Sequence, residues 1–228
     1  MKRSEINRLI NDAKELLHRS NMSLPPFAYW STEDWKRKGP ECDEIRACRL
    51  GWDVTDFGLG RFDKAGLVIF TVRNGHPTIP EYRVKTYCEK IIIIQPGQRC
   101  PLHFHWSKTE DIINRYGGKL VFRIYDSSAE EKPADTDVVV SRDGVKKSYP
   151  PGAEVVLGRG ESLTIPARMY HEFWADEAGG PVVAGEVSAV NDDQADNRFL
   201  EPVGRFPRIE EDCLPVHYLC TEYPISRE

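Results

Sequence analysis

The chain has 228 residues, 40% of them apolar, and a formal net charge of −5, which is the composition of an ordinary globular protein. No basic stripe indicates a nucleic-acid partner, and no run of about 18 apolar residues predicts a membrane span. The N-terminus has no apolar signal core, and the six cysteines include no C-x-x-C pair. We therefore expect a cytoplasmic protein with reduced thiols and with neither nucleic-acid nor membrane partners.

The first part of the chain has the apolar spacing of helices. In residues 4–18, apolar side chains recur every three or four positions, which predicts an amphipathic helix. A shorter helix is expected over residues 31–38, with Ser31 as its N-cap. We assign residues 1–64 to an N-terminal helical extension of a single structural domain.

From residue 65 the pattern changes to short apolar runs with the alternation of β-strands. Asn74-Gly75 and Asp143-Gly144 are turn signals between such runs. The expected strands lie within residues 65–75, 87–97, 119–126, 136–149, 161–166, 171–176 and 181–190. Strands at this spacing, without helices between them, predict an all-β barrel or sandwich over residues 65–190, with residues 191–228 wrapped around it.

The segment CPLHFHWSKTED, residues 100–111, concentrates ionisable side chains directly after an apolar run. His103 and His105 are two residues apart, so on a strand they would point to the same side. Glu110 follows after a short bend and could add a carboxylate. This donor set suits divalent manganese, iron, cobalt, nickel or zinc. Taken alone, an H-x-H pair more often represents two partly exposed histidines on an edge strand.

The spacing around these residues resembles the first motif of the cupin family, G-x5-H-x-H-x4-E-x6-G. The matching positions are Gly97, His103, His105, Glu110 and Gly117.

The second cupin motif, G-x5-P-x-G-x2-H-x3-N, is matched in part by Gly160, Pro166 and His171. Arg168 replaces its second glycine and Ala175 its asparagine. The resemblance implies a double-stranded β-barrel, also called a jelly roll. It also implies a metal ion inside the barrel, and its ligands would be His103, His105, Glu110 and His171.

The likeness extends over nearly the whole chain. The segments LPPFAYWSTEDW, PLHFHWSKTEDIINRYGG and GEVSAVNDDQADNRF together resemble the bacterial D-lyxose isomerase group of cupins. The resemblance implies interconversion of D-lyxose with D-xylulose and of D-mannose with D-fructose. It further implies a divalent metal, typically Mn²⁺, and a homodimer that acts on a monosaccharide.

Five further residues are candidates for the chemistry of an aldose–ketose isomerase. We expect Lys108, between two ligands, and Glu186, in the last apolar strand, to move a proton through an enediol intermediate. Lys90, Asp193 and Arg198 are expected to contact sugar hydroxyls. The alternatives are a solvated surface for the lysines, an outward ion pair for Glu186 and a plain polar loop for Asp193 and Arg198.

Other functions remain open at this point. An iron dioxygenase would use the same ligands but a mainly apolar pocket. A non-catalytic cupin would bind a sugar without converting it. A phosphosugar isomerase would need a cationic cluster, for which Lys90, Lys108 and Arg168 are available.

Overall fold

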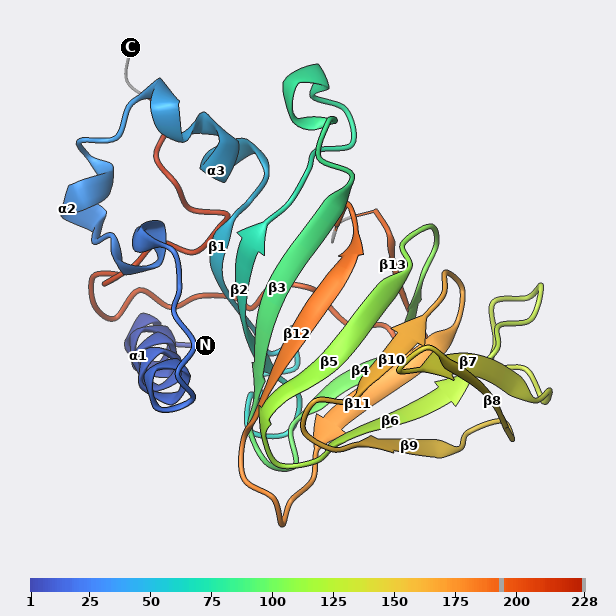
Figure 1. Cartoon of the computed structure of the whole chain (residues 1–228). Helices are drawn as coiled ribbons and strands as arrows, with labels where there is room; N and C mark the ends of the chain where they lie inside the picture. Colours follow the sequence, from blue (N-terminus) through green and yellow to red (C-terminus); the bar gives the residue numbers. More distant parts are fainter. Residues whose placement is uncertain (193–194, 227–228) are drawn as a thin grey trace.

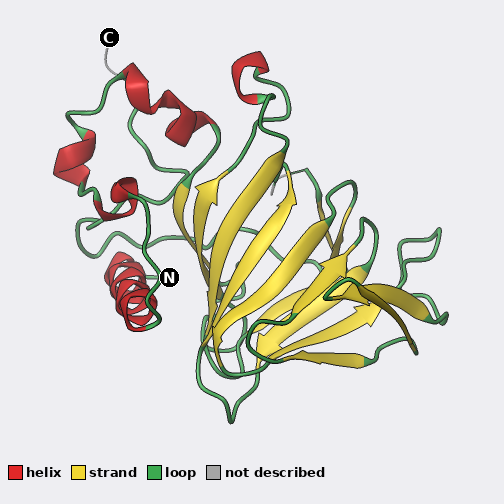
Figure 2. Cartoon of the chain, viewed as in Figure 1, coloured by secondary structure: helices red, strands yellow, loops and turns green. Residues whose placement is uncertain are grey.

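The computed structural model describes residues 1–192 and 195–226, and within them thirteen strands form two antiparallel sheets that face each other (Figures 1 and 2). The larger sheet has the order β1-β2-β3-β12-β5-β10-β7-β8, and the smaller one β13-β4-β11-β6-β9. The larger sheet contains β1 (Gly51–Thr55), β2 (Leu67–Arg73), β3 (Tyr87–Ile94), β12 (Val182–Ala189), β5 (Glu110–Gly117), β10 (Ser162–Ile165), β7 (Val138–Arg142) and β8 (Val145–Tyr149). The smaller sheet contains β13 (Asn197–Phe199), β4 (Arg99–His105), β11 (Tyr170–Ala175), β6 (Leu120–Tyr125) and β9 (Glu154–Leu157).

The main hydrophobic core lies between the two sheets. Alternate side chains point inward, so that Ile92 and Ala184 of the larger sheet meet Phe122 and Ile124 of the smaller one. This confirms the predicted all-β barrel. The sheets also reach beyond residues 65–190, because β1 precedes that range and β13 follows it.

A second core covers the outer face of the larger sheet. Helix α1 (Arg3–Arg19) lies beside the outer face of the sheet (Figure 1). Its apolar side packs against the sheet, with Ile6 and Ile10 in the same cluster as Trp52 and Phe70. The helix predicted over residues 4–18 is therefore confirmed. It forms because its buried residues share one face.

The remaining helices are short. They are α2 (Thr32–Trp35), α3 (Asp43–Ala47) and three single turns of 3-10 helix, η1 (Pro26–Tyr29), η2 (Pro40–Cys42) and η3 (Pro80–Tyr82). Ser31 caps α2, as predicted, through a reciprocal pair of hydrogen bonds with Asp34. Helix α2 ends earlier than the expected residue 38. No helix among the described residues is long and apolar enough to span a membrane.

Of the two turn signals, only one closes a hairpin. Asp143 and Gly144 both have positive φ, 51° and 80°, and join β7 to β8 in a two-residue turn. In contrast, Asn74 and Gly75 begin the long connection 74–86 between β2 and β3. The Asn74 side chain forms hydrogen bonds with the backbone of Asn191, so the Asn-Gly pair at 74–75 does not mark a hairpin turn.

Candidate metal centre and active site

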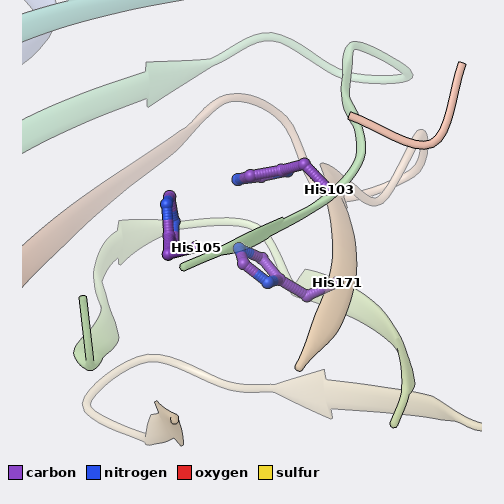
Figure 3. Close-up of side chains that lie close together, drawn as sticks. All are labelled: His103, His105 and His171. Carbon is purple, nitrogen blue, oxygen red and sulfur yellow. The ribbon is translucent and has the colours of Figure 1, made fainter. Parts of the chain in front are cut away.

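Three histidines converge inside the barrel (Figure 3). His103 and His105 point inward from β4, and His171 lies opposite His103 on the neighbouring strand β11. All three are buried, and one ligand nitrogen from each lies within 4.8 Å of the other two. The i, i+2 spacing and one strand pairing are therefore enough to gather the three rings.

Two of the rings are oriented by backbone carbonyls. The Nδ1 atom of His103 lies 2.8 Å from the carbonyl oxygen of Pro101, and that of His171 lies 3.0 Å from the carbonyl oxygen of Met169. A carbonyl can only accept a hydrogen bond, so both Nδ1 atoms carry the hydrogen. Each Nε2 atom then presents a lone pair, as a metal ligand requires.

Glu110, the first residue of β5, brings its carboxylate to the Nε2 atoms of His171 and His105. Its Oε1 atom is 3.1 Å from Nε2 of His171, and its Oε2 atom is 3.5 Å from Nε2 of His105. Within the described part of the chain, Nε2 of His171 is buried without a well-formed hydrogen bond. Two acceptors at 3.1 Å repel each other unless a cation or a proton lies between them. The donor set therefore fits a divalent metal ion.

The protonation states agree with this fit. Burial lowers the pKa of His103 and His105, so their imidazoles are neutral at pH 7. Burial on its own would raise the pKa of Glu110, but the charge of Lys108 and the nearby His105 outweigh it and hold that pKa well below its usual range. The pocket thus offers neutral imidazoles and an ionised carboxylate.

A balanced charge cluster adjoins the histidines. Lys108, on the bend between β4 and β5, has its Nζ atom 2.8 Å from Oε2 of Glu110 and 2.9 Å from Oε1 of Glu186. Lys90 on β3 is paired with Glu186 on β12, and their Nζ and Oε1 atoms are 3.4 Å apart. None of the four side chains is more than 5% exposed. Two ammonium groups and two carboxylates therefore neutralise each other away from water.

Glu186 is kept ionised by this arrangement. Burial would raise the pKa of its carboxyl group, but Lys108 and Lys90 lower it below the usual value. The hydrogen bonds from Lys108 and from Ser188 both reach Oε1 of Glu186. A carboxylate in this state can act as a base.

These groups line one cavity, whose empty volume of about 480 Å³ includes the part open to solvent. The lining combines the charged cluster and the histidines His103 and His105 with apolar side chains, including Leu67, Ile69, Ile92 and Phe173. The cavity therefore offers a small polar ligand both charged groups and apolar contacts.

Not every predicted site residue lies there. The structure brings the following residues to the cavity lining: His103, His105, Glu110, Lys108, Glu186 and Lys90. His171 is fully buried next to His103, with 4.2 Å between the ring centroids. The expectation that Arg198 contacts the sugar is corrected. Arg198 pairs with Phe104 on β4, and its side chain binds Glu131 outside the cavity lining, with 2.9 Å between Nε and Oε2. Strand alternation turns Arg198 away from the cavity and turns Asn197 toward it. Asp193 lies outside the described residues.

Several residues of the cavity had no clear signal in the sequence. Asn197 and Phe199 would have been found by reading NRF as a strand, but three residues give too short a pattern. Arg205 lines the cavity from the C-terminal segment and binds Asp53 of β1, with 2.5 Å between Nη2 and Oδ2. Asn191 accepts hydrogen bonds from both lysines of the charge cluster. Contacts between segments so far apart in sequence need the fold.

The departure from the second cupin motif leaves its turn intact. Arg168 has φ = 66°, the left-handed conformation that glycine adopts most easily. Its backbone N–H donates to the carbonyl oxygen of His105 over 2.7 Å, next to the ligand-bearing strands. Its guanidinium lies 5.0 Å from the ring centroid of Trp106, outside the cavity. The arginine thus preserves the backbone geometry around the histidines.

Comparisons with known proteins agree with this architecture. The family model for D-lyxose isomerase matches residues 1–223. The chain is 42% identical to a D-lyxose/D-mannose isomerase of Escherichia coli O157:H7 and to one of Serratia proteamaculans, in each case over 98% of both chains. An L-ribose isomerase of Geodermatophilus obscurus shares the fold, with a TM-score of 0.61 at 17% identity over 91% of this chain and 98% of that one. The chain belongs to the D-lyxose isomerase family.

Proposed function

We propose that the protein is a metal-dependent aldose–ketose isomerase that interconverts D-lyxose with D-xylulose and D-mannose with D-fructose. The observation that carries the proposal is the ionised Glu186, held by Lys108 beside three convergent histidines and Glu110 in one cavity. The names of the relatives support these substrates.

His103, His105, Glu110 and His171 would hold the divalent ion, which we propose to be Mn²⁺. When bound, such an ion polarises a carbonyl group and makes the neighbouring C–H bond more acidic. Nitrogen and carboxylate oxygen donors together suit manganese as one of several divalent metals, and the resemblance to the D-lyxose isomerase group favours it among them.

The proton transfer is assigned to Glu186. Because Lys108 and Ser188 bind its Oε1 atom, Oε2 is the oxygen that takes the proton from the hydroxyl-bearing carbon next to the carbonyl and returns it to the former carbonyl carbon. The hydroxyl proton passes from the oxygen of that hydroxyl-bearing carbon to the former carbonyl oxygen, which completes the conversion of aldose to ketose. Lys108 stabilises negative charge on the enediol oxygen, since its ammonium is fixed between Glu110 and Glu186. Lys90 would contact a sugar hydroxyl. Asn197 takes the place that the sequence suggested for Arg198.

The alternatives fit the geometry less well. A phosphosugar isomerase needs cations with spare charge, but Lys90 and Lys108 are each in ion pairs with buried carboxylates. The third candidate, Arg168, stacks on Trp106 instead of lining the cavity. A dioxygenase for an aromatic substrate has no use for four buried charges, whereas a polyhydroxylated sugar can bond with them.

The resemblance noted in the sequence also leads us to propose a homodimer that works in the cytoplasm. Size-exclusion chromatography with light scattering would measure the mass, which is twice 26.1 kDa for a dimer. Fractionation of the producing cells would test the compartment.

The proposed function is tested with chelator-treated protein. This protein is assayed with each divalent metal against D-lyxose, D-mannose, their ketoses and the corresponding phosphosugars. We expect no isomerisation without metal, the highest rate with Mn²⁺ and a preference for unphosphorylated sugars. Full activity of exhaustively metal-free protein would contradict metal dependence, and a preference for phosphosugars would contradict the substrate class.

A further inference from the structure

We propose that Asn74 is a positioning residue for catalysis: it holds Asn191 in place, and Asn191 sets the positions of the ammonium groups of Lys90 and Lys108. The inference rests on the proposed function, because it concerns the same cavity. It gives a role to a residue in the connection between β2 and β3, residues 74–86.

The side-chain amide of Asn191 contacts both lysines of the charge cluster. Its Oδ1 atom accepts a hydrogen bond from Nζ of Lys90 over 2.7 Å and another from Nζ of Lys108 over 3.4 Å. Both ammonium groups also contact the same oxygen of Glu186. One amide oxygen therefore influences how far apart the two cations lie around the proposed base.

The side chain of Asn74 holds the backbone of Asn191 through two hydrogen bonds. The Oδ1 atom of Asn74 accepts from the Asn191 N–H over 3.0 Å, and its Nδ2 atom donates to the Asn191 carbonyl oxygen over 3.1 Å. A second N–H of the same amide reaches the carbonyl oxygen of Cys48 over 3.4 Å. The side chain is 5% exposed, so water does not replace these bonds easily.

The positions of the lysines are sensitive to this support. Asn191 follows the end of β12 at Ala189, so no strand ladder holds its backbone. The 3.4 Å contact with Lys108 is already long, and a small shift of Asn191 would break it. A lysine ammonium sits on a flexible four-carbon stem and depends on fixed acceptors. Misplacement of a catalytic group by about 1 Å can cost about 100-fold in rate.

A matched control exists elsewhere in the chain. The side chain of Asn7 on α1 makes the same two kinds of bond, accepting from the Val216 N–H over 3.0 Å and donating to the Leu214 carbonyl oxygen over 2.9 Å. This clamp also joins distant segments, but it lies outside the cavity lining. Asn7→Ala therefore removes the same pattern of hydrogen bonds at a more exposed position, without touching the charge cluster.

The test compares Asn74→Ala, Asn191→Ala, their double variant and Asn7→Ala in the metal-loaded protein. We expect kcat to fall about 10- to 100-fold in Asn74→Ala, in Asn191→Ala and in the double variant, with unchanged metal stoichiometry and a much smaller change in KM. The double variant should be no slower than Asn191→Ala, because Asn74 acts through Asn191. Asn7→Ala should keep the wild-type kcat. A kcat within twofold of wild type for folded Asn74→Ala, or losses that multiply in the double variant, would overturn the inference.

A second readout does not depend on activity. In protein labelled with ¹⁵N-lysine, the ammonium groups of Lys90 and Lys108 should give signals protected from exchange with water, assigned with Lys90→Arg. We expect this protection to fall in Asn74→Ala and Asn191→Ala and to persist in Asn7→Ala. Undiminished protection in Asn191→Ala, which keeps the backbone clamp, would overturn the inference even if Asn74→Ala failed to fold. If no sugar is isomerised by the wild type, the proposed function fails while this measurement still decides the positioning role.

Discussion

Two regions of the molecule bury cations against pairs of carboxylates, and they differ in what the charges leave unsatisfied. Inside the barrel, Lys108 bridges Glu110 and Glu186, and Glu110 also faces the lone pair of His171. On the outside of the barrel, Arg3 bridges Glu211 and Glu222. The same charge pattern thus occurs inside the barrel next to the histidines and on the outside between α1 and the C-terminal segment.

In the outer cluster, every carboxylate oxygen accepts a hydrogen bond. Arg3 donates to both oxygens of Glu211, over 2.6 and 2.9 Å, and to both oxygens of Glu222, over 2.5 and 3.1 Å. These hydrogen bonds raise the pKa of Arg3 and lower that of Glu211. Four of the five N–H donors of Arg3 thus bind the two carboxylates, and all four carboxylate oxygens have a partner, so this cluster fastens the C-terminal segment to α1.

The inner cluster is incomplete as protein alone. The facing acceptor atoms of Glu110 and His171 leave a place for a cation. The described hydrogen bonds of Lys108 and Ser188 go to Oε1 of Glu186, so its Oε2 atom can take a proton. We conclude that buried charge marks a reactive site when ligand atoms remain unmatched, and a structural clamp when they do not.

The largest effect is expected when a proposed metal ligand of the inner cluster is removed. His171→Ala should abolish metal binding at the site and lower kcat/KM by at least about 1,000-fold, since loss of Lewis-acid polarisation removes several kcal/mol of transition-state stabilisation. Metal titration and sugar assays on the same sample check this. Retention of both metal and activity would show that the histidine cluster is not the catalytic centre.

The next largest effect is expected at the proposed base. Glu186→Gln keeps the shape but cannot accept the proton, so kcat should fall about 100- to 10,000-fold. Metal stoichiometry should stay the same, because Glu186 is not among the proposed ligands. Initial rates and metal analysis test both statements, and a variant with near-normal kcat would exclude Glu186 as the base.

A change in the outer cluster should affect stability and spare the chemistry. Arg3→Met leaves the carboxylates of Glu211 and Glu222 without their cation, at a cost of about 1–3 kcal/mol; the value is below that of a fully buried pair because both glutamates are partly exposed. Urea denaturation measures this loss. A wild-type kcat/KM is expected, and a large drop in activity would mean that the two clusters are coupled.

The smallest effect concerns acid pH. Arg3 holds the pKa of Glu211 below its ordinary value of 4.5 in the folded protein, so this pair stabilises the fold above that pH and the contribution is lost as pH falls through the lowered pKa. The stability difference between wild type and Arg3→Met should therefore shrink below pH 4.5. Denaturation curves at several pH values follow the trend, and a gap that widens in acid would have the wrong sign.

Much of this site could be predicted because its information is local. The i, i+2 spacing of His103 and His105 already requires a shared face, and motif spacing adds Glu110 and His171. The helix over residues 4–18 and the barrel strands follow from periodicities that tertiary contacts later reinforce.

The parts that escaped prediction depend on long-range geometry. Strand β13 is three residues long, so no alternation reveals that Arg198 faces outward and Asn197 inward. Asn74 looks like a turn residue, yet its partner is 117 positions later. A pattern within one segment cannot describe a contact between two segments that meet only in the folded chain.

The most direct test of the central claim is isomerisation of D-lyxose in deuterium oxide by the Mn²⁺-loaded protein, continued over many turnovers and followed by proton NMR. Proton transfer by Glu186 should place deuterium on the carbon next to the carbonyl of D-xylulose, because a carboxylate exchanges its proton with solvent between turnovers. Complete retention of the substrate hydrogen after prolonged reaction would contradict the account and indicate a hydride shift.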